Sequence, residues 1–262
     1  MQIIQSPLDS RLTDYHLLKS KESDSEYFIA DHERTAVRLL NSDIEVKSVF
    51  CTEKYWEKHK SIIESKLKDQ NHCYVADKSV FEETIGFHVH QGFMAIGKQR
   101  WSKNLNFEHP ILVINSIMDS ENIGSILRTA AAFGIRTIII DSKSASPYLR
   151  RSVRVSMGAI FHLNLVNTTD LVGQIKKLKG SGSSIISLSL PKETNSLSGK
   201  LKTIREIENP KNIVLIIGNE ANGIEEEILH LSDILCYIPM KNQIDSLNVS
   251  HALAVALSHL IN

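Results

Sequence analysis

The segment Ile213-Val-Leu-Ile-Ile-Gly-Asn-Glu-Ala-Asn-Gly-Ile224 is an apolar run that ends in a polar loop with two glycines. The run is typical of a buried strand, and residues 224–231 after it have a helical pattern. The same change from apolar to polar residues occurs at Asn122-Ile-Gly-Ser-Ile-Leu-Arg128 and at Ile238-Pro-Met-Lys-Asn-Gln-Ile-Asp-Ser-Leu-Asn-Val-Ser250. We therefore expect three strand–loop–helix corners that together build one composite site.

Apolar runs and helical patterns alternate through the second half of the chain. This alternation predicts an α/β fold with a parallel sheet that is covered on both faces. Such sheets bind ligands at the carboxyl ends of their strands, which is where the three polar corners fall. Strands are predicted at residues 111–114, 137–140, 162–166, 184–190, 213–217 and 234–238, and the last helix at 247–261.

The first 105 residues predict a smaller α/β domain of their own. The polar segment 97–106 has turn composition and no apolar period, so we place a linker there and divide the chain into residues 1–105 and 106–262. Within the first domain, helices are predicted at 35–40 and 53–67, and strands at 46–50, 73–76 and 92–97.

Composition excludes several classes of protein. The chain has 262 residues, of which 42% are hydrophobic and 23% charged, as in soluble globular proteins. There is no apolar stretch of the ~20 residues that span a bilayer and no signal-peptide pattern, so a cytoplasmic location is expected. The three cysteines are far apart, and the pair His88 and His90 lacks a third ligand, so neither a disulfide framework nor a metal site is predicted.

The formal net charge is zero, which argues against a protein that coats a polyanion. Residues 128–154 nevertheless hold six cations against Asp141 alone. The cations are Arg128, Arg136, Lys143, Arg150, Arg151 and Arg154. Two interpretations remain open, a solvated helix face and a stripe that contacts phosphates, and the second makes Arg150, Arg151 and Arg154 candidate RNA contacts.

Common nucleotide-binding motifs are absent. The chain has neither a G-x-G-x-x-G after a first strand nor a G-x-x-x-x-G-K-[ST], so a Rossmann dehydrogenase and a P-loop enzyme are not favoured. At the first corner, Ser120 or Asn122 can cap the following helix, and Arg128 would oppose the helix dipole near its start, which suggests an anionic partner. Each corner taken alone could be purely structural.

Taken together and in this order, the corners resemble the SpoU (TrmH-like) family of RNA 2′-O-ribose methyltransferases in the SPOUT superfamily. The first motif matches residues 122–130, the second 215–223, and the third 238–240 and 246–250, while residues 154–163 resemble the family's middle segment. The chain departs from the pattern at Asn242, where glycine is usual, and at Asp245, where glutamate is commoner.

Residues 1–105 are similar to the L30e-like RNA-binding domain that often precedes this catalytic domain. The similarity lies at residues 28–31 and 90–95, with Asp31 in place of a usual glutamate. Such a domain favours ribosomal RNA over transfer RNA as the substrate.

The resemblance implies S-adenosylmethionine as cofactor, a deep trefoil knot in the C-terminal domain, and a homodimer with sites built across its interface. The implied cofactor-binding residues are Leu188, Gly218, Asn219, Ile238, Met240 and Leu247. The implied catalytic residues are Asn122, Arg128, Glu220, Ser246 and Asn248. Three alternatives remain: a transfer RNA 2′-O-methyltransferase, a base methyltransferase of the same superfamily, and a non-catalytic RNA-binding protein that retains the fold.

Overall fold

A computed structural model describes residues 1–16, 26–88, 90–103, 108–191, 195–208 and 210–261. The chain forms two compact units, Met1–Arg100 with Ser146–Phe161, and Trp101–Ala145 with His162–Asn262. Residues 104–106 of the predicted linker, and with them the boundary at 105, lie outside the described residues.

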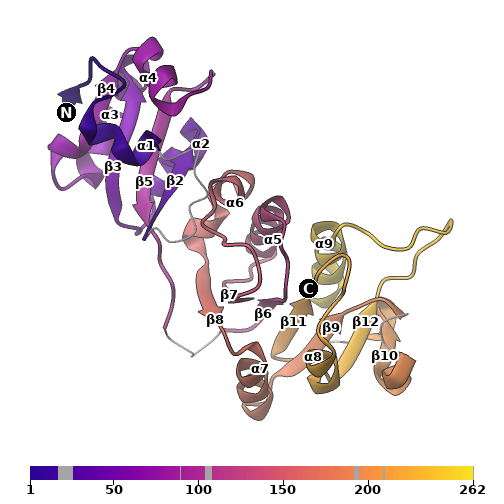
Figure 1. Cartoon of the computed structure of the whole chain (residues 1–262). Coiled ribbons are helices and arrows are strands. Elements are labelled where there is room, and N and C mark those ends of the chain that lie inside the picture. Colours follow the sequence, from indigo (N-terminus) through magenta and orange to yellow (C-terminus); the bar gives the residue numbers. More distant parts are fainter. Residues whose placement is uncertain (17–25, 89, 104–107, 192–194, 209, 262) are drawn as a thin grey trace. The chain divides into compact units, whose positions relative to one another are not determined.

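The first unit is built on a five-stranded mixed sheet in the order β1-β4-β3-β5-β2 (Figure 1). Strands β1, β4 and β3 run parallel, and β5 is antiparallel to both β3 and β2. The strands are β1 Gln2–Ile3, β2 Tyr27–Asp31, β3 Val46–Thr52, β4 Cys73–Ala76 and β5 Phe93–Lys98. The helices of the first hundred residues are α1 Thr13–His16, α2 Glu33–Leu40, α3 Glu53–Lys66 and α4 Lys78–Ile85.

The predicted elements of the first domain are all present, with shifts of one or two residues at half of their ends. Strands β1 and β2 were not predicted. β1 has two residues, too few for any periodicity, and the alternation that marks a half-buried strand is missing from β2, whose last four residues are all buried.

The second unit is built on a seven-stranded sheet in the order β10-β12-β9-β11-β6-β7-β8, and every pair in it is parallel. All six predicted strands are present, so the predicted parallel sheet is confirmed. The strands are β6 Ile111–Ile114, β7 Thr137–Asp141, β8 Asn164–Thr168, β9 Ser184–Leu188, β10 Leu201–Thr203, β11 Ile213–Ile217 and β12 Ile234–Tyr237. The helices are α5 Ser120–Ala132, α7 Leu171–Gly180, α8 Glu226–Leu231 and α9 Val249–Leu260.

Helices cover both faces of this sheet, α7 and α8 on one side and α5 with α9 on the other (Figure 1). Alternate strand residues such as Ile111 and Val113 join the core beneath α7 and α8, while Leu112 and Ile114 are equally buried on the opposite face. Burial on both faces explains why the strands are continuously apolar. It also leaves the strand ends as the place for polar groups.

Residues 146–161, with helix α6 Arg150–Val155, belong to the first unit although they lie in the middle of the second in sequence. Arg150 Nε donates to Asp31 Oδ2 at 2.7 Å, and Arg38 donates to the carbonyl oxygen of Met157. Sequence periodicity does not reveal that residues 146–161 pack with the first unit.

No helix among the described residues is long and apolar enough to cross a membrane. In the same residues, His, Cys, Asp and Glu side chains form no group of three or more that could hold a metal ion.

Candidate functional site

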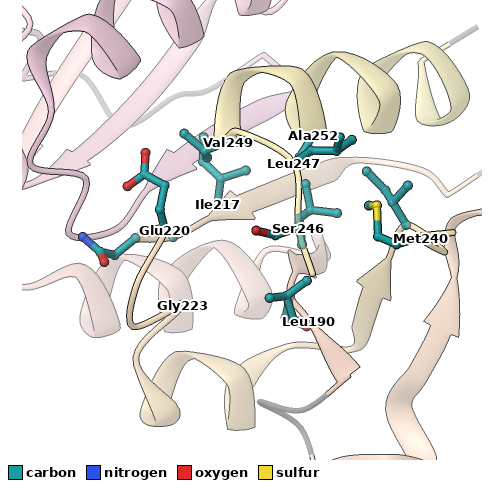
Figure 2. Close-up of a pocket in the computed structure, with 14 residues that line it drawn as sticks. Leu190, Ile217, Glu220, Gly223, Met240, Ser246, Leu247, Val249 and Ala252 are labelled. Atoms are coloured by element: carbon teal, nitrogen blue, oxygen red, sulfur yellow. The ribbon is translucent and has the colours of Figure 1, made fainter. Parts of the chain in front are cut away.

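Three loops at the carboxyl ends of neighbouring strands line one pocket in the second unit (Figure 2). The strands are β12, β9 and β11, which lie side by side in the sheet, so their following loops meet at one edge. All six residues predicted to bind a cofactor lie in the pocket wall: Leu188, Gly218, Asn219, Ile238, Met240 and Leu247. The remaining lining residues are Ser189, Leu190, Ile217, Glu220, Gly223, Ser246, Val249 and Ala252.

Of these, Glu220 and Ser246 were predicted as catalytic residues, and their presence in the wall links the pocket to the predicted chemistry. Ser189, Leu190, Ile217, Gly223, Val249 and Ala252 were not predicted to line the site. Val249 and Ala252 are on the first turn of α9. They could have been found from the rule that helix N-termini and strand ends meet at the same edge of a parallel sheet.

The loop after β11 is a tight hairpin over residues 218–223. Asn219 and Gly223 exchange backbone hydrogen bonds of 2.9 Å in both directions, and Asn219 Oδ1 accepts from the amides of Ala221 and Asn222. A Cβ atom at Gly218 would lie 2.5 Å from the carbonyl oxygen of Gly223, so only glycine fits there. The absence of a side chain at Gly218 therefore lets Gly223 pack against it, and this contact shapes the pocket wall.

The loop after β12 contains two residues in the left-handed backbone region, Asn242 with φ 57° and Gln243 with φ 58°. This conformation explains why glycine is usual at position 242 in the family that the chain resembles. Asparagine is the non-glycine residue that tolerates left-handed backbone best, so Asn242 can replace glycine without changing the path of the loop.

Beside the pocket, Asn122, Glu220 and Asn248 form a chain of hydrogen bonds. Asn122 Nδ2 donates to Glu220 Oε1, and Asn122 Oδ1 accepts from Asn248 Nδ2 at 2.9 Å. Asn248 in turn caps α9, with its Oδ1 accepting from the Ser250 amide at 2.9 Å. The amide of Asn122 is thus held from both ends, and three segments far apart in sequence meet at one corner.

The cap of α5 differs from the prediction. Asp119, and neither Ser120 nor Asn122, is the N-cap residue, because its carboxylate accepts from the amides of Glu121 and Asn122. This leaves the Asn122 side chain available for Glu220 and Asn248. An aspartate at the cap also suits the positive end of the helix dipole.

Arg128 is exposed and is the ninth residue of the 13-residue helix α5. The argument that its charge opposes the helix dipole is therefore wrong, because that effect is limited to the first turn. Within the described ranges, the side chain of Arg128 makes no hydrogen bond or ion pair. The side chain is exposed, and its binding of an anion stays a prediction.

The proposed stripe of cations is partly neutralised. Lys143 Nζ lies 2.8 Å from Glu225 Oε1, Arg136 lies 3.6 Å from Glu108, and Arg150 is paired with Asp31. Arg151 is exposed and Arg154 is half-buried, both on α6. The six cations therefore do not act as one set of unpaired charges, and Arg150 is the weakest of the three candidate RNA contacts.

The pocket wall suits a ligand that has both apolar and polar parts. It combines apolar side chains such as Leu247, Met240 and Ile238 with the half-buried Gly218 and with polar residues such as Asn219 and Ser246. The hydroxyl of Ser189 is buried in this wall without a hydrogen-bond partner among the described residues. An unsatisfied polar atom beside an apolar pocket indicates a site that a partly polar ligand completes.

Comparison with known proteins gives a match of residues 109–258 to the SpoU rRNA Methylase family. The matched segment is more than half of the chain and includes the pocket and the Asn122 corner. The chain belongs to the SpoU rRNA Methylase family.

Relatives of this SpoU chain agree with that placement. It is 25% identical over 262 residues to 23S rRNA (guanosine(2553)-2′-O)-methyltransferase RlmP of Bacillus subtilis, covering 99% of both chains. It is 36% identical over 141 residues to an uncharacterised tRNA/rRNA methyltransferase of Borreliella burgdorferi, covering 53% of this chain and 58% of the relative.

Solved structures share the SpoU fold. The AdoMet-bound rRNA methyltransferase from Sinorhizobium meliloti has a TM-score of 0.82 at 21% identity, covering 98% of this chain and 96% of that one. The SpoU methyltransferase AviRb from Streptomyces viridochromogenes has a TM-score of 0.77 at 17% identity, covering 96% of each chain. The predictions of the family, of the α/β fold class and of an RNA methyltransferase are confirmed.

Proposed function

We propose that this chain transfers a methyl group from S-adenosylmethionine to a ribose 2′-hydroxyl of ribosomal RNA. The observation that supports this most directly is that the pocket and the hydrogen-bonded corner of the second unit share a residue. A largely apolar pocket made of three strand-end loops shares Glu220 with the Asn122–Glu220–Asn248 corner. The pocket suits the donor and the corner suits a hydroxyl acceptor.

The residues that would hold S-adenosylmethionine are Gly218, Ile238 and Leu247, chiefly through their backbone, with Leu188, Asn219 and Met240 beside them. When bound, the cofactor supplies a methyl group on a positively charged sulfur, which is already activated for transfer. The chain then needs to align the acceptor oxygen and to stabilise the charge that develops on it.

Asn122 and Asn248 are suited to alignment. Asn122 is fixed by its two hydrogen bonds, and Asn248 is fixed by capping α9, so neither side chain has to be ordered when RNA binds. Groups that are held in place before the reaction stabilise the transition state without a reorganisation cost. Glu220 and Ser246, both exposed at the pocket, complete the reactive corner.

Arg128 has the role of a charge stabiliser in this proposal. An arginine guanidinium keeps its proton near neutral pH, so it cannot accept another and act as a base. An exposed arginine on α5, the helix that carries Asn122, can instead clamp a phosphate of the RNA and stabilise the developing alkoxide. Deprotonation of the hydroxyl would be aided by the RNA itself.

The first unit is proposed to bind the RNA, in keeping with its similarity to L30e-like domains. In the same proposal, the functional domains are residues 1–105 and 106–262, although residues 146–161 pack with the first compact unit. Arg151 and Arg154 on α6 would contribute phosphate contacts, with Arg150 in a lesser role because Asp31 already pairs with it. Family resemblance further supports a homodimer, a trefoil knot and a cytoplasmic location; the oligomeric state can be measured by light scattering.

Ribosomal RNA is favoured because the RlmP relative, which this chain matches along its whole length, acts on 23S rRNA. Transfer RNA is the second candidate substrate, since several relatives, matched along nearly the whole chain or over about half of it, are named tRNA/rRNA methyltransferases. A non-catalytic RNA-binding protein is disfavoured by the intact corner of Asn122, Glu220 and Asn248.

The test is transfer of labelled methyl from S-adenosylmethionine to total ribosomal and transfer RNA from a strain that lacks the gene. We expect label in ribosomal RNA that survives alkali within a dinucleotide, because a methylated 2′-oxygen cannot attack the neighbouring phosphate. Label in alkali-released mononucleotides would indicate base methylation instead. Cofactor binding without any transfer to either RNA would contradict the proposal.

The variant Asn248→Asp separates chemistry from folding. Aspartate caps a helix as well as asparagine does, but it replaces the Nδ2 donor to Asn122 with an acceptor. We expect kcat to fall about 100-fold, with the Kd for S-adenosylmethionine changed by less than about threefold. The matched control is Asp170→Asn, the reverse exchange at the cap of α7, which should leave kcat unchanged.

A further inference from the structure

A polar cluster with a buried centre lies beside the hairpin, at the carboxyl ends of β6 and β7. It consists of Asn115, Ser116, Asp141, Ser144 and Glu225, and none of these residues was predicted to take part in the site. Asn115 is 0% exposed and Asp141 is 5% exposed. Polar groups buried this deeply are retained only where their hydrogen bonds are made.

Asp141 is the centre of the cluster. Its Oδ2 accepts from Asn115 Nδ2 at 3.0 Å, from the Ser116 amide at 2.9 Å and from Ser116 Oγ at 3.3 Å. Its Oδ1 accepts from the Ser144 amide at 2.9 Å and from Ser144 Oγ at 2.5 Å. Every contact uses Asp141 as an acceptor, so an asparagine of the same size would point a donor at other donors.

Two links connect this cluster to the hairpin 218–223. Asn219 Nδ2 donates to the carbonyl oxygen of Ser116 at 2.8 Å, which ties the first turn of the hairpin to the cluster. At the other end, the Glu225 amide donates to Asn115 Oδ1, and Asn115 Nδ2 donates to Glu225 Oε1, both at 3.0 Å. The hairpin is therefore attached to the cluster on each side.

Glu225 remains charged in this setting. Its hydrogen bond from Lys143, followed by those from Asn115 and Ser116, lowers the pKa of the Glu225 carboxyl below its usual value. The charged carboxylate keeps the far end of the hairpin attached to Asn115 throughout the neutral pH range.

The geometry points to Asp141 as a positioning residue for methyl transfer, which it supports by fixing the hairpin that carries Glu220 against Asn122. The path runs from Asp141 through Ser116 to Asn219, along the hairpin to Glu220, and on to Asn122 and Asn248. Asp141 touches neither pocket nor corner, so its effect is transmitted through the loop. This inference rests on the proposed methyl transfer for its kinetic consequence and on the hydrogen bonds alone for its structural one.

The test compares Asp141→Asn with Ile175→Ala. Ile175 is fully buried on α7 in the apolar core, and its side chain has no polar atom that could join the hydrogen bonds of the cluster, so we expect this variant to lower stability without loosening the hairpin. We expect Asp141→Asn to lower kcat about 100-fold, with the KM for RNA within about threefold. Its amides at Ala221, Asn222 and Gly223 should exchange hydrogen at least about tenfold faster than in the wild type.

Ile175→Ala should lower Tm about as much as Asp141→Asn does. It should nevertheless leave kcat and these exchange rates near the wild-type values. A second variant, Asn219→Asp, keeps the acceptor for the amides of Ala221 and Asn222 but removes the donor to Ser116. It should lower kcat and speed exchange with little loss of Tm, and it replaces Asp141→Asn if that variant does not fold.

Wild-type kcat and exchange rates in both Asp141→Asn and Asn219→Asp would overturn the inference, and so would an equal loss of kcat in Ile175→Ala. If the wild-type protein transfers no methyl group, the proposed function fails. In that case the exchange rates alone test whether Asp141 fixes the hairpin.

Discussion

The two sheets of this chain place their polar groups in different ways. In the seven-stranded sheet every strand is parallel, so all carboxyl ends lie at one edge, and the loops after β9, β11 and β12 build one pocket. In the five-stranded sheet β5 is antiparallel to both of its neighbours, and loops leave from both edges. The charged side chains of the first unit form separate pairs, such as Asp31 with Arg150 and Asp43 with Arg100.

This difference shows which of the two sheets can bring catalytic groups together. A parallel sheet brings strand ends and helix N-termini together at one edge, whereas a mixed sheet distributes them. Changes at the polar edge of the second unit should therefore affect methyl transfer or cofactor affinity. Changes to the ion pairs of the first unit should affect its stability instead.

The largest expected effect comes from Arg128→Ala in the second unit. Loss of the only charge proposed to stabilise the alkoxide should lower kcat at least about 1,000-fold, equivalent to about 4 kcal/mol of transition-state stabilisation. Because Arg128 does not line the pocket, the Kd for S-adenosylmethionine should stay within about twofold. Single-turnover kinetics and calorimetric titration measure the two quantities.

Arg136→Ala is the control for that variant, since Arg136 is an exposed arginine of the same unit that pairs with Glu108 outside the corner. It should keep kcat within about twofold of the wild-type value. Equal loss of turnover and of cofactor binding in Arg128→Ala would contradict the role given to Arg128.

A smaller effect is expected from Gly218→Ala, which tests the pocket wall. The added Cβ would lie 2.5 Å from the Gly223 carbonyl oxygen and 2.6 Å from Ile224 Cγ1, so the hairpin must shift. We expect the Kd for S-adenosylmethionine to rise about 100-fold, or about 2.7 kcal/mol. Gly180→Ala at the end of α7 meets nothing within 4 Å and should leave cofactor affinity unchanged.

Much of this arrangement could be predicted from the sequence. The continuous apolar runs located six of the seven strands of the parallel sheet, because burial on both faces removes any polar alternation. β10 has only three residues and an exposed Lys202, so it gave no such run. The six cofactor-binding predictions came from motif resemblance, and the structure brings those residues into one pocket wall.

The polar cluster could not be predicted from the same patterns. Asn115 and Asp141 directly follow apolar runs, which signals a strand end, but sequence position does not show that Asp141 contacts Ser116 or that Asn115 contacts Glu225. The pairing of Arg150 with Asp31 is equally non-local, since the residues are 119 positions apart. Such contacts depend on the three-dimensional path of the chain and have no periodic signature.

The smallest expected effect is that of Asp31→Asn in the first unit, where the charge is structural. Burial raises the pKa of the Asp31 carboxyl, but His32 and Arg150 outweigh it, so that the pKa lies below the usual 3.8. Because the folded pKa is depressed, the unfolded chain binds more protons in acid, and the stabilisation present above pH ~4 is lost as the pH falls further.

Asp31→Asn should lower the free energy of unfolding of the first unit by about 1.5–2 kcal/mol at pH 7 and flatten its dependence on pH below ~4. Denaturant unfolding followed by the fluorescence of the buried Trp56, in a Trp101→Phe background, reports this quantity. Asp43→Asn removes an exposed carboxylate from the pair with Arg100 and should lower stability by less than about 0.5 kcal/mol. Because Asp31 lies in the mixed sheet and outside the pocket, Asp31→Asn should also leave cofactor affinity intact. A loss of cofactor affinity in this variant would contradict the view that ion pairs of the five-stranded sheet serve stability while the seven-stranded sheet carries the catalytic groups.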